Sequence, residues 1–388
     1  MRREPQILIE LALAFLRLGA TAFGGPAAHI GIMQQEFVTR RKWLDAQEFL
    51  DLVGATNLIP GPNSTEVAIH IGFKRAGLAG LVVAGVCFIA PAMLMVLMLA
   101  ALYTRHQSLP EMRWLLTGVQ PVVIAIIAHA LGKLARTAIK NRFTFVVAMA
   151  AIALVVCGLN EVAVIFLAAL TGLLAGAGKR QREYSLSEQD AENEPKKTGA
   201  ALFIFAGATP LAMPMLAKLF LIFLKIGSLV YGSGYVLIAF LRDDFVAKTG
   251  WITDRQLLDA IAVGQLTPGP LFTSATFIGY LIGHVPGALV ATLGIFLPSF
   301  FFVALLARSL EKMRRSPRAR LFLDALNAAS IALMAVVTIQ LLAASIDDAG
   351  PFFPLALGIF SLLLLSATKI NSLWLLATGA LLGFVFRP

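Results

Sequence analysis

The chain has 388 residues, of which 58% are hydrophobic and 14% are charged, and its formal net charge is +10. A soluble domain cannot cover that share of apolar side chains, so the composition excludes a soluble enzyme and predicts an all-helical, polytopic membrane protein. In such a protein the excess of lysine and arginine reports basic cytoplasmic loops, not affinity for nucleic acid.

The first half opens with an apolar run over residues 7–33 that is interrupted at Phe23-Gly24-Gly25-Pro26. A basic loop containing Trp43 follows, and the next apolar segment, residues 49–73, is broken by Pro60-Gly61-Pro62. Proline removes a backbone donor and glycine tolerates dihedral angles that no helix uses, so we expect helix breaks at both places. Four further apolar runs complete this half: residues 77–103, 114–132, 143–158 and 161–178.

A charged stretch of 21 residues, 179–199, is predicted to be a cytoplasmic linker between a first repeat, residues 1–178, and a second, residues 200–388. The second repeat has an apolar run over residues 205–240 and a segment over residues 257–283 that is broken by Pro268-Gly269-Pro270. Four more runs follow: residues 286–307, 321–346, 352–367 and 370–386.

A constant offset indicates that the two halves are copies of one unit. A shift of 208 positions aligns Phe15 with Phe223, Trp43 with Trp251, and the two Pro-Gly-Pro motifs with each other. From Gly80 onward a shift of 207 continues the match. Chance would not hold one offset over so many positions, so the sequence predicts an internal duplication.

The distribution of lysine and arginine predicts that the copies are inverted. If all six segments of each half crossed the membrane, the loops would hold 14 Lys/Arg on one side and 15 on the other. If each Pro-Gly-Pro segment instead enters and leaves on one face, the counts become 21 and 8. The positive-inside rule therefore favours an inverted repeat with five spanning helices and one re-entrant Pro-Gly-Pro hairpin per half, and with the N-terminus outside.

Helix starts after the two breaks are candidate anion sites. A helix that begins inside the membrane presents unpaired N–H groups and the positive end of its dipole. Polar side chains follow each break, at Asn63-Ser64-Thr65 and at Thr273, and they could donate hydrogen bonds to an oxyanion. The alternative is that these residues only cap kinked helices.

Two cations at equivalent repeat positions favour the anion reading. Arg17 and Lys225 each lie inside an apolar run, where an unpaired cation is costly, and seven residues before a break, Gly24-Gly25-Pro26 or Gly232-Ser233-Gly234. Seven residues is two helical turns, within reach of a long side chain. Snorkelling to the membrane surface is the alternative, but a symmetric pair beside helix breaks suits a dianion better.

Other polar residues within the apolar segments have less definite roles. Glu66 and His70 share a helix face at i and i+4, and they could either carry a proton or form a structural hydrogen-bonded pair. Asp51 and Asp259 open the two Pro-Gly-Pro segments, and we interpret them as N-terminal caps. We interpret His29 as structural because its repeat equivalent is Leu237.

The motifs Phe15-Leu16-Arg17-Leu18-Gly19, Phe23-Gly24-Gly25-Pro26 and Pro60-Gly61-Pro62-Asn63, with Pro268-Gly269-Pro270 in the second half, resemble the chromate ion transporter family. The resemblance covers nearly the whole chain and matches the long-chain, two-domain members. It implies secondary, ATP-independent efflux of chromate across the bacterial inner membrane, and hence chromate resistance.

The residues alone predict an anion, and only the resemblance supplies chromate. Sulfate or another oxyanion as cargo, or an anion channel instead of a carrier, remain alternatives. With no Walker loop, no histidine pair at metal-ligand spacing and no Gly-x-Ser-x-Gly motif, we predict no enzyme activity, cofactor or metal site. The expected partners are the chromate or sulfate anion and the bilayer, with a homodimer as an option and no nucleic acid.

Overall fold

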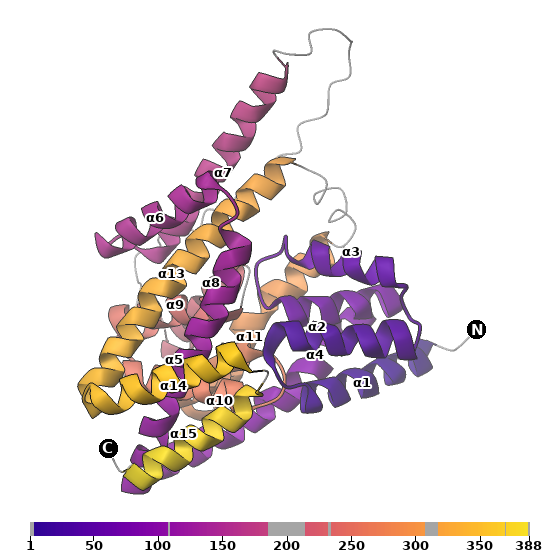
Figure 1. Cartoon of the computed structure of the whole chain (residues 1–388). Helices are drawn as coiled ribbons and strands as arrows, with labels where there is room; N and C mark the ends of the chain where they lie inside the picture. Colours follow the sequence, from indigo (N-terminus) through magenta and orange to yellow (C-terminus); the bar gives the residue numbers. More distant parts are fainter. Residues whose placement is uncertain are drawn as a thin grey trace.

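The structure is a computed structural model that describes residues 4–107, 109–184, 214–231, 234–306, 317–368 and 370–386. Within these ranges every regular element is a helix (Figure 1). The first half contains α1 (Glu4–Thr21), α2 (Gly25–Met33), the π-helix η1 (Gln34–Arg40), α3 (Ala46–Thr56), α4 (Asn63–His106), α5 (Pro110–Ala138), α6 (Arg142–Val156) and α7 (Glu161–Tyr184). The second half contains α8 (Met215–Leu229), η2 (Gly234–Val236), α9 (Leu237–Leu241), η3 (Arg242–Lys248), α10 (Asp254–Leu266), η4 (Leu271–Thr273), α11 (Ser274–Leu306), α13 (Pro317–Ala349), α14 (Phe352–Ala367) and α15 (Ser372–Phe386).

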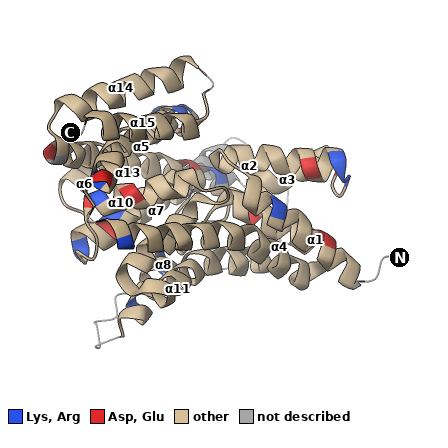
Figure 2. Cartoon of the chain, turned by 90° about the horizontal axis from the view of Figure 1, so that it is seen from below, with Lys and Arg blue, Asp and Glu red and all other residues tan. Residues whose placement is uncertain are grey.

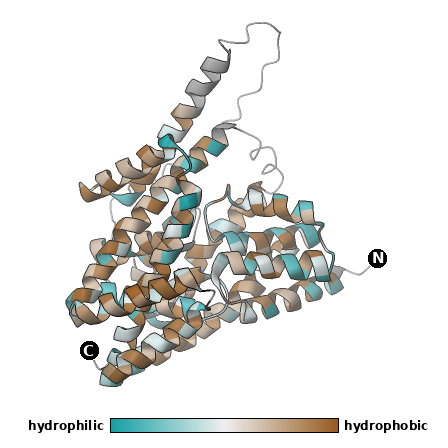
Figure 3. Cartoon of the chain, viewed as in Figure 1, coloured by the Kyte–Doolittle hydropathy of each residue, from teal (hydrophilic) through white to brown (hydrophobic). Residues whose placement is uncertain are grey.

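The surface of this bundle is that of a membrane protein. Four helical stretches are long and apolar enough to cross a bilayer: Asn63–His106, Pro110–Ala138, Leu271–Leu306 and Ala319–Asp347. Large apolar side chains are exposed, with Met98, Ile339 and Val385 each 66–68% exposed. Hydrophobic residues predominate along most of the helices (Figure 3). Charged residues are absent from residues 76–104 of α4 and from α11 (Figure 2). The prediction of a polytopic helical membrane protein is confirmed.

Both Pro-Gly-Pro motifs interrupt a helix, as the sequence predicts. Between α3 and α4 the chain passes through Gly61 at φ 133°, and between α10 and η4 it passes through Gly269 at φ 92°. The first break is the tip of a helical hairpin, because Lys74, beyond the tip, forms an ion pair of 2.5 Å with Glu48 at the start of α3.

A second sharp turn divides α4 and α11, the helices that leave these tips. The backbone is non-helical at Ala76 and Gly77 in α4 and at Gly283 and His284 in α11. Gly72 lies against Gly80 so closely that a Cβ on either would overlap the carbonyl oxygen of the other. Eight residues of straight helix would hold them about 12 Å apart, so the first part of α4 folds back on the second. Gly279 and Gly287 make the equivalent contact in α11.

The helix before each Pro-Gly-Pro segment also forms a hairpin. The chain turns after α1 at Ala22–Gly24, and α2 with η1 returns along α1, which brings the rings of Phe15 and Phe37 to 5.0 Å. In the second half the equivalent rings, Phe223 and Phe245, are 4.8 Å apart.

Reciprocal contacts relate the two halves by a pseudo-two-fold. The amide of Gly61 donates to the carbonyl of Val230 at 2.7 Å, and the equivalent amide of Gly269 donates to the equivalent carbonyl of Ala22 at 2.9 Å. The halves also exchange helices: α5 packs on α14 and α15, and its equivalent α13 packs on α6 and α7. Such exchange of equivalent contacts is the signature of an isologous interface.

Candidate functional site

A small pocket forms where the hairpin tip between α1 and α2 meets the second Pro-Gly-Pro motif. The pocket therefore draws on both halves of the chain. Its lining residues are Gly24, Gly25, Pro26, Tyr235, Gly264, Gln265, Thr267, Gly269 and Leu271.

Glycines allow the backbone to form one wall of this pocket. Gly24, at φ 106°, is the N-cap of α2, and Gly25 follows at φ 78°. These are left-handed conformations that glycine adopts without strain. The N-cap residue Gly24 has no side chain to cap α2, and Pro26 has no N–H, so the N–H groups of Gly25 and Ala27 in the first turn could bind a ligand or water. The positive end of the helix dipole adds to their attraction for an anion.

The opposite wall carries a buried donor. The Gln265 side-chain nitrogen Nε2 is inaccessible to solvent and makes no well-formed hydrogen bond among the described residues, although the Tyr235 hydroxyl lies near its side chain. Leaving a buried amide donor unpaired costs about 1–3 kcal/mol, which a bound acceptor would recover. An oxyanion is such an acceptor, so the pocket combines two features that suit one.

Three of the four predicted polar residues at the helix starts form hydrogen bonds within the protein. Thr273 is buried and donates its hydroxyl to the carbonyl of Pro270, three residues earlier, at 2.8 Å. Asn63 donates to the Asn57 side chain at 2.6 Å. Ser64 lies 3.3 Å from the His29 ring nitrogen Nδ1, so His29 ties the two hairpin tips of the first half together. Thr65 is buried and its hydroxyl has no partner within the described chain.

Of the residues predicted to bind substrate, Gly24, Gly25, Pro26 and Gly269 line the pocket, whereas the others do not. The remaining ones are Arg17, Pro60, Gly61, Pro62, Asn63, Ser64, Thr65, Lys225, Pro268, Pro270 and Thr273. Gly232 and Ser233 of the second-half break lie outside the described residues.

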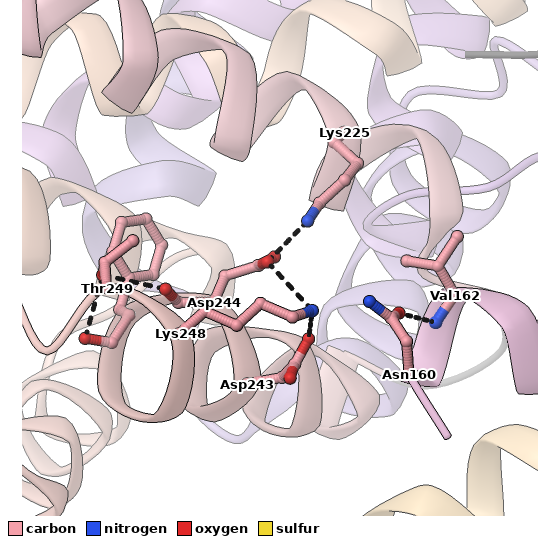
Figure 4. A network of polar contacts seen from close by, with 8 residues as sticks. Asn160, Val162, Lys225, Asp243, Asp244, Lys248 and Thr249 are labelled. Atoms are coloured by element: carbon pink, nitrogen blue, oxygen red, sulfur yellow. Dashed lines mark hydrogen bonds and ion pairs between the residues drawn. The ribbon is translucent and has the colours of Figure 1, made fainter. Parts of the chain in front are cut away.

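The two equivalent cations have different surroundings. Lys225 forms an ion pair of 2.5 Å with Asp244, whose side chain is only 6% exposed, within a network that includes Lys248 and Asp243 (Figure 4). Arg17 is exposed, and its guanidinium has no ion-pair partner in the described chain. Glu36, the repeat equivalent of Asp244, is paired with Arg40 and Arg41 instead. An anion would find Arg17 free, whereas it would have to compete with a carboxylate for Lys225.

Glu66 and His70 form no hydrogen bond with each other among the contacts of the described residues, so the structure does not bear out a structural hydrogen-bonded pair. Glu66 is fully buried, and its Oε1 accepts a hydrogen bond of 3.3 Å from Ser299 in the other half. Its Oε2 and the His70 Nδ1 have no partner among the described residues.

The interpretation of Asp51 and Asp259 as caps is wrong. Asp45 caps α3 and Thr253 caps α10, each accepting a hydrogen bond from the backbone three residues on. Asp259 lies fully buried in the middle of α10, where it accepts hydrogen bonds from Tyr103 at 2.9 Å and Gln120 at 3.1 Å. Both donors come from the first half, more than 130 residues away in sequence, so no local pattern could have indicated them.

Comparison with known proteins supplies an identity for the fold. The family model of the chromate transporter matches residues 9–173 and again residues 217–384. A chromate transport protein of Cupriavidus metallidurans is 33% identical over 384 residues, which cover 98% of this chain and 94% of that protein. A chromate transport protein of Pseudomonas aeruginosa is 30% identical over 99% of this chain and 94% of its own length. A probable chromate transport protein of Synechococcus elongatus is 29% identical, covering 89% of this chain and 87% of that protein.

No solved structure matches the chain. The two matches of the family model fall one in each half, which agrees with the duplication that the offset predicts. The chain therefore belongs to the chromate transporter family.

Proposed function

We propose that this chain is a secondary, ATP-independent transporter that exports chromate across the bacterial inner membrane and so confers chromate resistance. Membership of the chromate transporter family and the names of three relatives support chromate as the substrate. Chromate is a tetrahedral dianion, and the pocket between the halves offers hydrogen-bond donors for one. With a volume of about 10 Å³ in this structure, the pocket must widen to admit it.

The observation that carries the proposal is the pairing of an uncapped helix start with an unpaired buried amide in one pocket. The first-turn N–H groups of α2 would bind one oxygen of the dianion, and the Gln265 amide would bind another. Gly24 and Gly25 have no side chains, so the backbone can approach the anion closely. Arg17, which is free of carboxylates, would supply long-range attraction to the site.

We propose further that the two halves have inverted topology and that transport proceeds by movement of one half against the other. The Pro-Gly-Pro hairpins would then be re-entrant. The reciprocal amide bonds of Gly61 and Gly269 support a pseudo-two-fold. Gly85 of α4 lies against the Phe300 ring of α11, and their repeat equivalents are Thr292 and Met93. If a two-fold axis relates the halves, the contact of residue 85 with residue 300 implies an equivalent contact of residue 93 with residue 292. The residue numbers then rise along α4 while they fall along α11, so the two helices run antiparallel. An inverted repeat requires this arrangement.

Transport assays with purified protein in liposomes would separate the alternatives. A carrier should saturate with chromate and should show counterflow, in which unlabelled chromate inside accelerates uptake of labelled chromate. A channel should show neither behaviour. Equal transport of labelled sulfate would replace chromate with oxyanions in general as the substrate class, and absence of any chromate flux would contradict the proposal.

Arg17 gives a residue-level test of the same proposal. Arg17→Gln should reduce chromate flux at least tenfold while membrane insertion and yield stay unchanged, because the only change is loss of a cation that has no carboxylate partner in the described chain. Arg136→Gln, at another exposed arginine, is the matched control and should transport normally. Unchanged flux in Arg17→Gln would remove Arg17 from the substrate path.

A further inference from the structure

The two Pro-Gly-Pro tips are equivalent in the repeat but differ in chemistry. A shift of 208 aligns Gly61 with Gly269 and Glu66 with Ser274. The Glu66 carboxyl and the Ser299 hydroxyl lie directly against Gly61. The group against Gly269 is the methyl of Ala92, which a shift of 207 aligns with Ser299. The first tip thus carries an acid where the second has none.

No contact among the described residues neutralises this acid. Glu66 is fully buried, its Oε1 accepts one hydrogen bond of 3.3 Å from Ser299, and its Oε2 has no partner in the described chain. No lysine or arginine of the described residues forms an ion pair with it. Burial of an unpaired carboxylate costs several kcal/mol in general, and a bound proton removes that cost.

The groups that surround Glu66 include no second carboxyl and no lysine or arginine among the described residues. Ser299 comes from α11 and Tyr231 from the segment after α8, within electrostatic reach of the carboxyl. On its own helix the titratable neighbour is His70, and His29 of α2 contacts the adjacent Ser64.

We infer that Glu66 is the proton-binding site of the transport cycle and that the two duplicated Pro-Gly-Pro tips bind different ligands. The first tip would bind a proton and the second would bind the dianion. This inference rests on the proposed function, because it concerns how the same transporter is coupled. The proton on Glu66 and the bound dianion attract each other, so we expect them to be exported together. Such a complex still carries net negative charge, and the membrane potential would drive it outward.

The physical link is the repulsion between a carboxylate and a dianion in one low-dielectric region. Protonation of Glu66 removes this repulsion, so each ligand should strengthen the binding of the other by the same factor. Coulomb's law, for charges of one and two at an assumed separation of about 10–15 Å and an effective dielectric constant near 20, gives a factor of roughly 40- to 300-fold.

The test is the chromate dissociation constant of detergent-solubilised full-length protein between pH 6 and pH 8.5. In the wild type, affinity should rise by up to roughly 40- to 300-fold as the pH falls, and binding should take up protons from a weakly buffered solution. Glu66→Gln mimics the protonated acid and should bind chromate tightly at every pH. Because chromate itself takes up a proton in mildly acidic solution, the readout is the ratio of wild-type to variant affinity at each pH.

Two controls assign the effect to this carboxyl. Glu161→Gln removes another partly buried carboxyl and should keep the wild-type pH dependence, and His70→Gln should keep it as well. The inference is overturned if Glu66→Gln keeps the wild-type pH dependence, if it folds but binds no chromate at any pH, or if wild-type binding takes up no proton. Absence of chromate binding by the wild type would instead refute the proposed function.

Discussion

At the scale of single residues, Asp259 joins the halves through a buried polar contact. Its carboxylate accepts hydrogen bonds from Tyr103 of α4 and Gln120 of α5. Truncation to alanine would leave both donors buried and unpaired in this contact, so we expect Asp259→Ala to lower the free energy of unfolding by about 2–4 kcal/mol. Thermal unfolding in detergent, followed by intrinsic fluorescence, measures the change.

The repeat provides the matched control for that measurement. Asp51 is the equivalent of Asp259, but it is half-buried and accepts a hydrogen bond of 3.1 Å from the exposed side chain of Gln47. An exposed contact of this kind contributes about 0–1 kcal/mol, so Asp51→Ala should unfold close to the wild-type temperature. Equal destabilisation by the two substitutions would contradict the role given to Asp259.

Lys225 and Arg17 show how one repeat position acquires two environments. Both residues descend from the same position, yet Asp244 neutralises Lys225 while Arg17 has no such partner in the described chain. The reason lies in the π-helices η1 and η3. Glu36 of η1 pairs with Arg40 and Arg41, whereas Asp244 of η3 pairs with Lys225 at 2.5 Å and with Lys248 only at 3.7 Å. Symmetry in sequence therefore does not imply symmetry in charge.

At the scale of elements, the return of α4 on itself depends on glycine. A Cβ on Gly72 would overlap the carbonyl oxygen of Gly80. We expect Gly72→Val to prevent close packing of the two parts of α4 and to abolish a monodisperse folded peak in size-exclusion chromatography, with Gly279→Val in α11 doing the same. Gly31→Ala is the control, because nothing lies within 4 Å of a Cβ there, and it should change stability by less than about 1 kcal/mol. A well-folded Gly72→Val protein would show that the hairpin does not need this contact.

The elements that sequence predicts well are those set by local chemistry. The breaks at Pro60-Gly61-Pro62 and Pro268-Gly269-Pro270 lie where proline and glycine forbid a helix, and the turn after Lys74-Arg75 separates two apolar runs. Contacts between segments that are distant in the sequence could not be predicted from local chemistry. The Glu66–Ser299 contact spans 233 residues, whereas helical spacing had suggested His70 as the partner of Glu66.

The substrate site shows the same limit. Four glycine and proline positions of the pocket could be named from the sequence, because helix breaks predict bare amides. Gln265 and Tyr235 could not be named, because only the approach of the two halves turns them toward one pocket. A polar residue close to a Pro-Gly-Pro motif was the available signal, and Gln265 lies three positions before Pro268.

At the scale of the whole molecule, the halves are interleaved instead of lying side by side. The long helices α5 and α13, which follow α4 and α11 in the chain, each pack against the last two helices of the opposite half. Glycines allow these helices to pack closely. Gly118 of α5 lies against Gly379 and Gly383 of α15, and Gly172 of α7 lies against Leu321 and Ala325 of α13. A movement that alternates access must therefore displace the hairpin tips relative to this exchanged framework, because separating the halves would expose it.

Inverted topology makes a prediction for the whole molecule that does not depend on transport. Thr39 and Ala247 are repeat equivalents, both are exposed, and each lies one residue before the end of a π-helix. In an inverted repeat they lie on opposite sides of the membrane, with Thr39 in the cytoplasm, because that assignment places 21 Lys/Arg inside and 8 outside. With Cys87 and Cys157 replaced by serine, a membrane-impermeant thiol reagent added to intact cells should label Ala247→Cys and leave Thr39→Cys unlabelled until the cells are opened. Arg136→Cys, in the last turn of α5 at the end assigned to the cytoplasm, should behave like Thr39→Cys. Labelling of Thr39→Cys and Ala247→Cys from the same side would mean that the two halves are parallel, and the pseudo-two-fold would then run along the membrane normal.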